Sequence, residues 1–148
     1  MAAAKGCNAG RSEIRTKGTI MADDNPSVLS HLSIGTNDFE EALTFYDAVL
    51  GTLGCSRELE HPGAVAYGKE FPEFWDQTPI DGEAASVPNG IPIEFLATTN
   101  AAVDAFYEAA LQAGGKAEGA PGPRPEYGEP YYGCFVRDLD GDKIEAMC

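Results

Sequence analysis

The chain has 148 residues, of which 43% are hydrophobic, and its formal net charge is -14. This length corresponds to about one domain, and an acidic surface repels phosphate backbones and anionic lipid, so we expect no binding to nucleic acid or to a membrane. No apolar run approaches the ~20 residues that a membrane-spanning helix needs.

The four cysteines predict no zinc site. They are Cys7, Cys55, Cys134 and Cys148, and they form no C-x-x-C pair. Because no signal peptide is recognisable either, we expect reduced thiols and a cytoplasmic protein.

Residues 1–26 are not expected to belong to the folded domain. They lack apolar periodicity, and the sequence at Met21 reads like a natural start. We therefore predict a tail that is disordered or an artefact of the start site, followed by one domain over residues 27–148.

The first predicted elements are a strand over residues 28–34 and a helix that begins near residue 39. The strand sequence, VLSHLSI, alternates apolar and polar residues. Asn37 with Glu40 three residues later resembles a capping box. Apolar residues then recur at helical spacing as far as Leu53, which predicts a helix that packs one face on a sheet.

The same pattern returns in the second half of the chain. FYDAVL at residues 45–50 reappears as FYEAAL at residues 106–111, and the flanking residues also align. A strand over residues 91–97 precedes this second helix. Repetition of strand, turn and helix in the same order predicts an internal duplication.

Three short strands are expected after each helix. They lie around residues 57–60, 64–68 and 73–77, and again around 116–118, 131–137 and 143–148. The result is an α+β fold of two βαβββ modules, with module one at 27–78, a Pro- and Gly-rich linker at 79–90 and module two at 91–148.

Three aspartates between the last two strands invite a calcium-binding interpretation. Gly141 comes too early among Asp138, Asp140 and Asp142 for an EF-hand loop, and the chain ends before the required glutamate. We therefore predict a hairpin turn.

The repeated βαβββ order, the helix FYDAVLGTLG and the closing PYYGCFVRDLDGDKIEAMC resemble the vicinal oxygen chelate superfamily. This superfamily contains glyoxalase I, bleomycin-resistance proteins and extradiol dioxygenases. The resemblance covers residues 28–148 and implies a cup-shaped mixed sheet with helices on the outside, in a homodimer. It does not fix the chemistry, because this fold hosts several activities.

The resemblance also implies metal ligands on the first and last strands of the modules. Carried over by position, these are His31 and Glu145, and Glu145 is also the candidate catalytic base. The position equivalent to His31 in module two is Pro92, which cannot bind a metal. A divalent ion, Ni, Zn or Fe, is therefore one alternative, and no cofactor is the other.

Further carboxylates could complete such a site. Glu94 shares a strand face with Pro92, and Glu73 or Asp76 could serve from the last strand of module one. A one-residue slip in register reverses which of these side chains faces the cup, so the choice stays open.

Four aromatic residues and one cation are candidates for binding a small-molecule ligand. Phe74, Trp75, Tyr131 and Tyr132 could line a pocket for a planar or apolar molecule, or could fill the core. Arg124 is one of the few cations available to an anionic group.

Two functions remain open. One is a metal-assisted lyase or isomerase of the glyoxalase I type that acts on a small molecule with vicinal oxygens. The other is a metal-free protein that binds and sequesters a small molecule, as bleomycin-resistance proteins do. Pro92 favours the second, whereas His31 and Glu145 favour the first.

Overall fold

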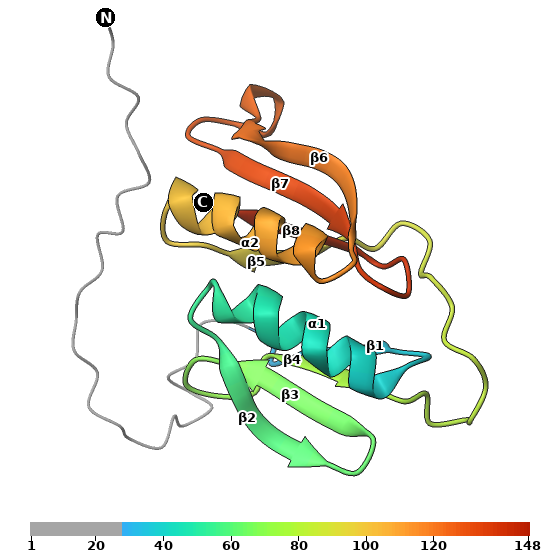
Figure 1. Cartoon of the computed structure of the whole chain (residues 1–148). Coiled ribbons are helices and arrows are strands. Elements are labelled where there is room, and N and C mark those ends of the chain that lie inside the picture. The colour runs from blue at the N-terminus through green and yellow to red at the C-terminus, as the bar shows by residue number, and fades with distance from the viewer. Residues whose placement is uncertain (1–27) are drawn as a thin grey trace, which may run out of the picture.

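The computed structural model describes residues 28–148 and contains two copies of the predicted βαβββ unit (Figure 1). The tail predicted at residues 1–26 lies outside the described residues. In the described part, no helix has the length and apolar character required to cross a membrane.

Each copy contains a strand, a helix and three further strands. Module one consists of β1 (Leu32–Gly35), α1 (Phe39–Gly51), β2 (Ser56–His61), β3 (Ala64–Gly68) and β4 (Phe74–Gln77). Module two consists of β5 (Ile93–Leu96), α2 (Asn100–Gln112), β6 (Lys116–Pro123), the short 3-10 helix η2 (Pro125–Tyr127), β7 (Tyr132–Arg137) and β8 (Lys143–Met147). The predicted α+β fold of two βαβββ modules is confirmed.

The two sheets have the same topology. Sheet one has the order β1-β4-β3-β2 and sheet two the order β5-β8-β7-β6. The first and last strands of each module pair in parallel, and the other pairs are antiparallel. Each module keeps its own four-stranded sheet, so β1 and β5 are edge strands of two open sheets.

Both helices begin at a side-chain cap. The Asp38 carboxylate accepts a hydrogen bond from the backbone N–H of Glu41 at 3.1 Å, and Thr99 caps α2 in the same way. The capping box predicted at Asn37 is wrong by one residue, because α1 begins at Phe39 and Asn37 instead bonds to Asp140 of module two.

One apolar core joins the two modules. Figure 1 shows α1 and α2 side by side in the middle of the molecule, and the two helices are in contact. Phe45 of α1 and Phe106 of α2, the first residues of the two repeated phrases, are both completely buried. The duplicated sequence therefore supplies the surface through which its two copies pack together.

A polar junction adds to this core. The Tyr46 hydroxyl donates a hydrogen bond of 2.5 Å to Asp138, which follows β7. Asp140, in the turn between β7 and β8, accepts hydrogen bonds from the Thr36 hydroxyl at 2.6 Å and from the Asn37 backbone N–H at 3.1 Å. The turn of module two is thus held against the start of α1 in module one.

Gly115 allows the modules to approach closely. A Cβ atom at this position would lie 2.9 Å from the carbonyl oxygens of Ala110 and Arg137 and 3.1 Å from the Phe45 ring. These neighbours are backbone and buried core, so they cannot move away cheaply. Gly51, at the end of α1, would meet nothing within 4 Å.

We predict that Gly115→Ala lowers the free energy of unfolding by ~1–3 kcal/mol, because overpacking displaces core atoms. Gly51→Ala is the matched control, and it should leave stability unchanged or raise it slightly, since alanine favours the helix. Urea unfolding measures both variants, and equal stabilities would contradict the proposed crowding at Gly115.

We predict that Tyr46→Phe destabilises the protein by about 1–2 kcal/mol, because it removes the buried donor to Asp138. Tyr107→Phe, at the equivalent but half-buried position of α2, is the control and should have a smaller effect. Chemical denaturation of both variants at one pH tests this, and equal losses would show that the Tyr46 hydrogen bond adds nothing.

Candidate functional site

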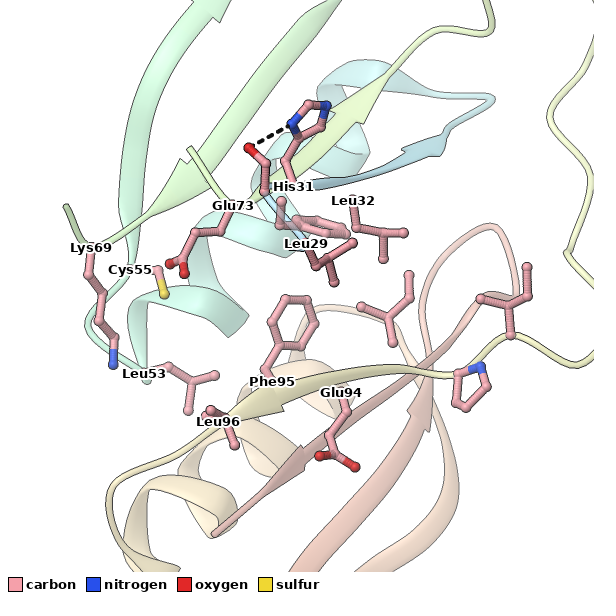
Figure 2. A pocket seen from close by; sticks show the side chains of 15 residues that line it. Leu29, His31, Leu32, Leu53, Cys55, Lys69, Glu73, Glu94, Phe95 and Leu96 are labelled. Carbon is pink, nitrogen blue, oxygen red and sulfur yellow. Dashed lines mark hydrogen bonds between the residues drawn. The ribbon is translucent and has the colours of Figure 1, made fainter. Parts of the chain in front are cut away.

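A pocket of about 690 Å³ lies where the edge strands β1 and β5 face each other (Figure 2). Its lining is mainly apolar, with a few polar groups among the hydrophobic side chains. The lining residues are Leu29, Ser30, His31, Leu32, Leu53, Cys55, Lys69, Glu73, Phe74, Ile91, Pro92, Ile93, Glu94, Phe95 and Leu96. Both modules contribute, so the pocket exists only because the modules pack together.

Aromatic packing connects this pocket to the core. The rings of Phe74 in β4 and Phe95 in β5 are 5.3 Å apart between centroids and meet edge to face. Phe95 in turn contacts Phe106 of α2, at 6.0 Å between ring centroids. Part of the pocket lining is therefore continuous with the aromatic rings of the core.

Cys55, Lys69 and Glu73 line the pocket on the module-one side (Figure 2). Burial raises the pKa of the Cys55 thiol, and the ammonium of Lys69 only partly opposes this rise. A protonated thiol is a weak nucleophile, so Cys55 offers the pocket a small polarisable surface rather than a reactive centre.

His31 lies at the pocket rim, directly before β1, and is exposed. Its Nδ1 atom is 3.4 Å from the Ser30 hydroxyl oxygen, and its ring meets Trp75 edge-on at 6.4 Å between centroids. The ring of His61 lies parallel to Trp75 at 6.1 Å. In Figure 2 the His31 ring points away from β5.

Glu94 and Glu145 are direct neighbours in sheet two, where they pair across the parallel strands β5 and β8. The Tyr131 hydroxyl contacts both carboxylates, at 3.0 Å for Glu94 and at a shorter distance for Glu145. The Glu145 side chain is only 5% exposed, and this burial raises its pKa. The hydrogen bond from Tyr131 lowers the pKa of Glu145, whereas the negative charge of Glu94 raises it further.

Sequence reasoning missed this bridge. It proposed Tyr131 as a ligand-binding residue and the two glutamates as metal ligands, whereas the three side chains contact one another. Ile144 and Ala146 lie in the core, so Glu145 between them lies on the opposite face of β8. This alternation could be predicted from the sequence of the strand. The proximity of Tyr131 depends on the path of the loop before β7, which no periodicity encodes.

Asp76 lies apart from the other predicted metal ligands. It alternates with Trp75 along β4, and its side chain is completely buried on the side of sheet one that faces α1. Burial raises the pKa of Asp76 to about 7, and the charges of Asp138 and Asp140 add to this rise. Asp76 does not line the pocket.

The predicted ligand-binding residues are also spread over the molecule. Phe74 is 3% exposed and forms part of the pocket floor, whereas Trp75 lies on the opposite face of sheet one. Tyr132 donates a 2.8 Å hydrogen bond to Asp104, and the Arg124 guanidinium lies 5.5 Å from the centre of the Phe135 ring.

The predicted donors do not form one metal site. Among residues 28–148, no three His, Cys, Asp or Glu side chains lie close enough together to hold a metal ion. His31 and Glu94 point away from each other across the pocket, and Tyr131 lies between Glu94 and Glu145. Within residues 28–148 these donors are therefore not gathered around one point, and the metal roles of His31, Glu94, Asp76 and Glu145 stay predictions.

No protein-family model and no curated protein matches the chain. Solved structures do match. A glyoxalase/bleomycin resistance protein from Albidiferax ferrireducens T118 is 37% identical, with a TM-score of 0.75, over 82% of this chain and 98% of that one.

Two more distant structures share the fold. A glyoxalase/bleomycin resistance protein/dioxygenase family enzyme from Burkholderia phytofirmans PsJN is 18% identical, with a TM-score of 0.61, over 80% of this chain and 96% of that one. The fosfomycin resistance protein FosX from Mesorhizobium loti is 17% identical, with a TM-score of 0.59, over 80% and 89% of the two chains.

The identity to the Albidiferax protein extends over nearly its whole length and is combined with the same duplicated βαβββ architecture. The repeated helix and the closing strand pair that suggested a relationship both lie within the described residues. The chain therefore belongs to the glyoxalase/bleomycin resistance protein family of the vicinal oxygen chelate superfamily.

Proposed function

We propose that this protein binds a small, largely apolar molecule in the pocket between β1 and β5, and that binding requires no metal ion. The supporting observation is the lining of this pocket, in which hydrophobic side chains from both modules predominate. Its volume of about 690 Å³ is in the usual range for small-molecule sites, ~300–1,000 Å³.

The polar groups of the pocket favour binding over metal-assisted chemistry. A catalytic metal site needs about three protein donors directed at one point, with a position left open for substrate. Here His31 and Glu94 diverge, and Lys69 and Glu73 lie at another part of the lining. Such separated groups can orient a bound molecule by single hydrogen bonds.

Glu145 supports a second candidate, a lyase or isomerase of the glyoxalase I type. It is a buried carboxyl group with a raised pKa at a position where relatives place a ligand or base, and such groups are candidates for proton transfer.

A homodimer remains part of both proposals. The exposed apolar side chains of Ile91 and Leu96 at the pocket rim are compatible with a covering partner.

We expect the neutral dye Nile red to bind the wild-type protein saturably, with an increase in its fluorescence. Leu96→Asp places a charge in the lining at a residue that is 72% exposed, so the fold should tolerate it while affinity falls about tenfold or more. Ile80→Asp, at a fully exposed linker residue, is the control and should bind like the wild type. Equal affinity in all three proteins would exclude this pocket as the binding site.

Metal titration separates the two candidates. Under the binding proposal, adding nickel, zinc or ferrous ions leaves the melting temperature of the wild type unchanged, and His31→Ala behaves identically. His61→Ala controls for adventitious binding by the other histidine of the chain. A rise in melting temperature that is lost in His31→Ala and in Glu145→Gln, but kept in His61→Ala, would replace the binding proposal with the lyase.

A further inference from the structure

Two cations meet at one aromatic ring on the face of sheet two that points away from the core. Phe135 of β7 lies between the buried core residues Cys134 and Val136, so its half-buried ring is on this outer face. The Lys143 ammonium lies over the ring at 4.6 Å from its centre, and the Arg124 guanidinium lies over it at 5.5 Å. Each contact is a favourable cation–π interaction, but two like charges beside one ring also repel each other.

Neither of these cations has a carboxylate partner. The chain has 24 acidic residues and only 10 basic ones, so a cation on its surface should readily find an acid. Arg57 and Arg137 do form ion pairs. In the part of the chain that the structure describes, no carboxylate oxygen lies within 4.0 Å of Arg124 or Lys143. Two unpaired positive charges beside one ring are therefore unusual in a chain of net charge -14.

The carboxylates that sense these charges already have other partners. Burial raises the pKa of Glu145, and both cations oppose this rise from the outer face. The Glu145 side chain is 5% exposed and accepts the Tyr131 hydroxyl. A hydrogen bond from Arg137 lowers the pKa of Glu118, the charge of Lys143 lowers it further, and Glu118 pairs with Arg137 at 2.5 Å. The two cations are thus left available to an anion from solution.

Backbone carbonyls hold Arg124 in place without using all of its donors. Its Nη2 atom donates to the Ala120 carbonyl at 2.7 Å, and its Nη1 atom donates to the Pro123 carbonyl at 3.2 Å. A guanidinium has five N–H donors, so others stay free. The Lys143 ammonium makes no hydrogen bond to another described residue, and all three of its donors are free.

Two glycines of β6 leave room for this arrangement. A Cβ atom at Gly119 would lie 2.7 Å from Cδ2 of Phe135, and a Cβ atom at Gly122 would lie 3.2 Å from Nη1 of Arg124. Neither glycine has a positive φ, so the close approach of these side chains, and not the backbone conformation, favours glycine here. The Phe135 ring and the Arg124 guanidinium therefore occupy space that side chains of β6 would otherwise fill.

We propose that Arg124 and Lys143 form a binding site for an oxyanion, the carboxylate or phosphate group of a small molecule, beside the Phe135 ring. The guanidinium offers a planar set of donors that fits two oxygens of such a group, and the ammonium adds a second positive charge. A bound anion offsets the repulsion between the two cations. None of these three residues lines the pocket between β1 and β5, so this site is separate from the one proposed above.

Titration of the 15N-labelled protein tests this site, with sodium benzoate and sodium phosphate as probes and sodium chloride to keep the ionic strength constant. We expect saturable shifts of the backbone N–H signals of Gly119 and Phe135, with a dissociation constant of about 1 mM. Lys143→Gln should weaken binding about tenfold, because one charge-assisted contact is lost. The probe that binds more tightly shows whether the site prefers a carboxylate or a phosphate group.

Lys116→Gln is the matched control for Lys143→Gln. It removes the same charge from an exposed residue of the same sheet, and Lys116 has no contact with the Phe135 ring, so binding should stay unchanged. Arg124→Lys keeps the charge but loses the planar set of donors, so it should also bind both probes more weakly than the wild type. Thermal unfolding of each variant shows that the fold is intact.

Two results would overturn the proposal. One is the absence of saturable shifts at Gly119 and Phe135 with either probe. The other is an equal loss of affinity in Lys116→Gln and Lys143→Gln, which would mean that binding follows the net charge of the protein and not this pair of cations.

Discussion

The packing of α1 against α2 is the contact on which the rest of this molecule depends. The two helices contact each other, and their apolar faces, which include Phe45 and Phe106, belong to one buried core cluster shared by both modules. Burial of such surface is the main favourable term in folding. Because this contact sets the position of one module relative to the other, it also determines that β1 faces β5 and that a pocket forms between them.

Much of the fold could be predicted because its signals are local. Helical periodicity identified α1 and α2, and the repeated FYDAVL and FYEAAL phrases predicted the duplication that both sheets confirm. The residues at which helices begin were harder to predict from the sequence. Asn37 and Asp38 are both good capping residues, and only the contact of Asn37 with module two decides that Asp38 caps the helix.

The candidate site was less predictable because it depends on register and on placement of the modules. Asp76 and Trp75 are adjacent in sequence but lie on opposite faces of sheet one, so an error of one residue in the predicted register exchanges the buried acid for the aromatic ring. Matching positions in the family could identify His31 and Glu145 as candidate site residues. The placement of these two residues relative to each other depends on how the helices pack. The partners of Glu145 follow from a loop that contains Tyr131.

Trp75 makes the fluorescence of the two halves of this duplicated molecule different. It is the single tryptophan of the chain, and it lies between two imidazole rings on the sheet of module one. Its emission therefore reports on one half of the protein, while the circular dichroism of two equally long helices reports on both. Comparing the two signals during refolding would show whether the ancestral halves still acquire structure separately or have become one cooperative unit.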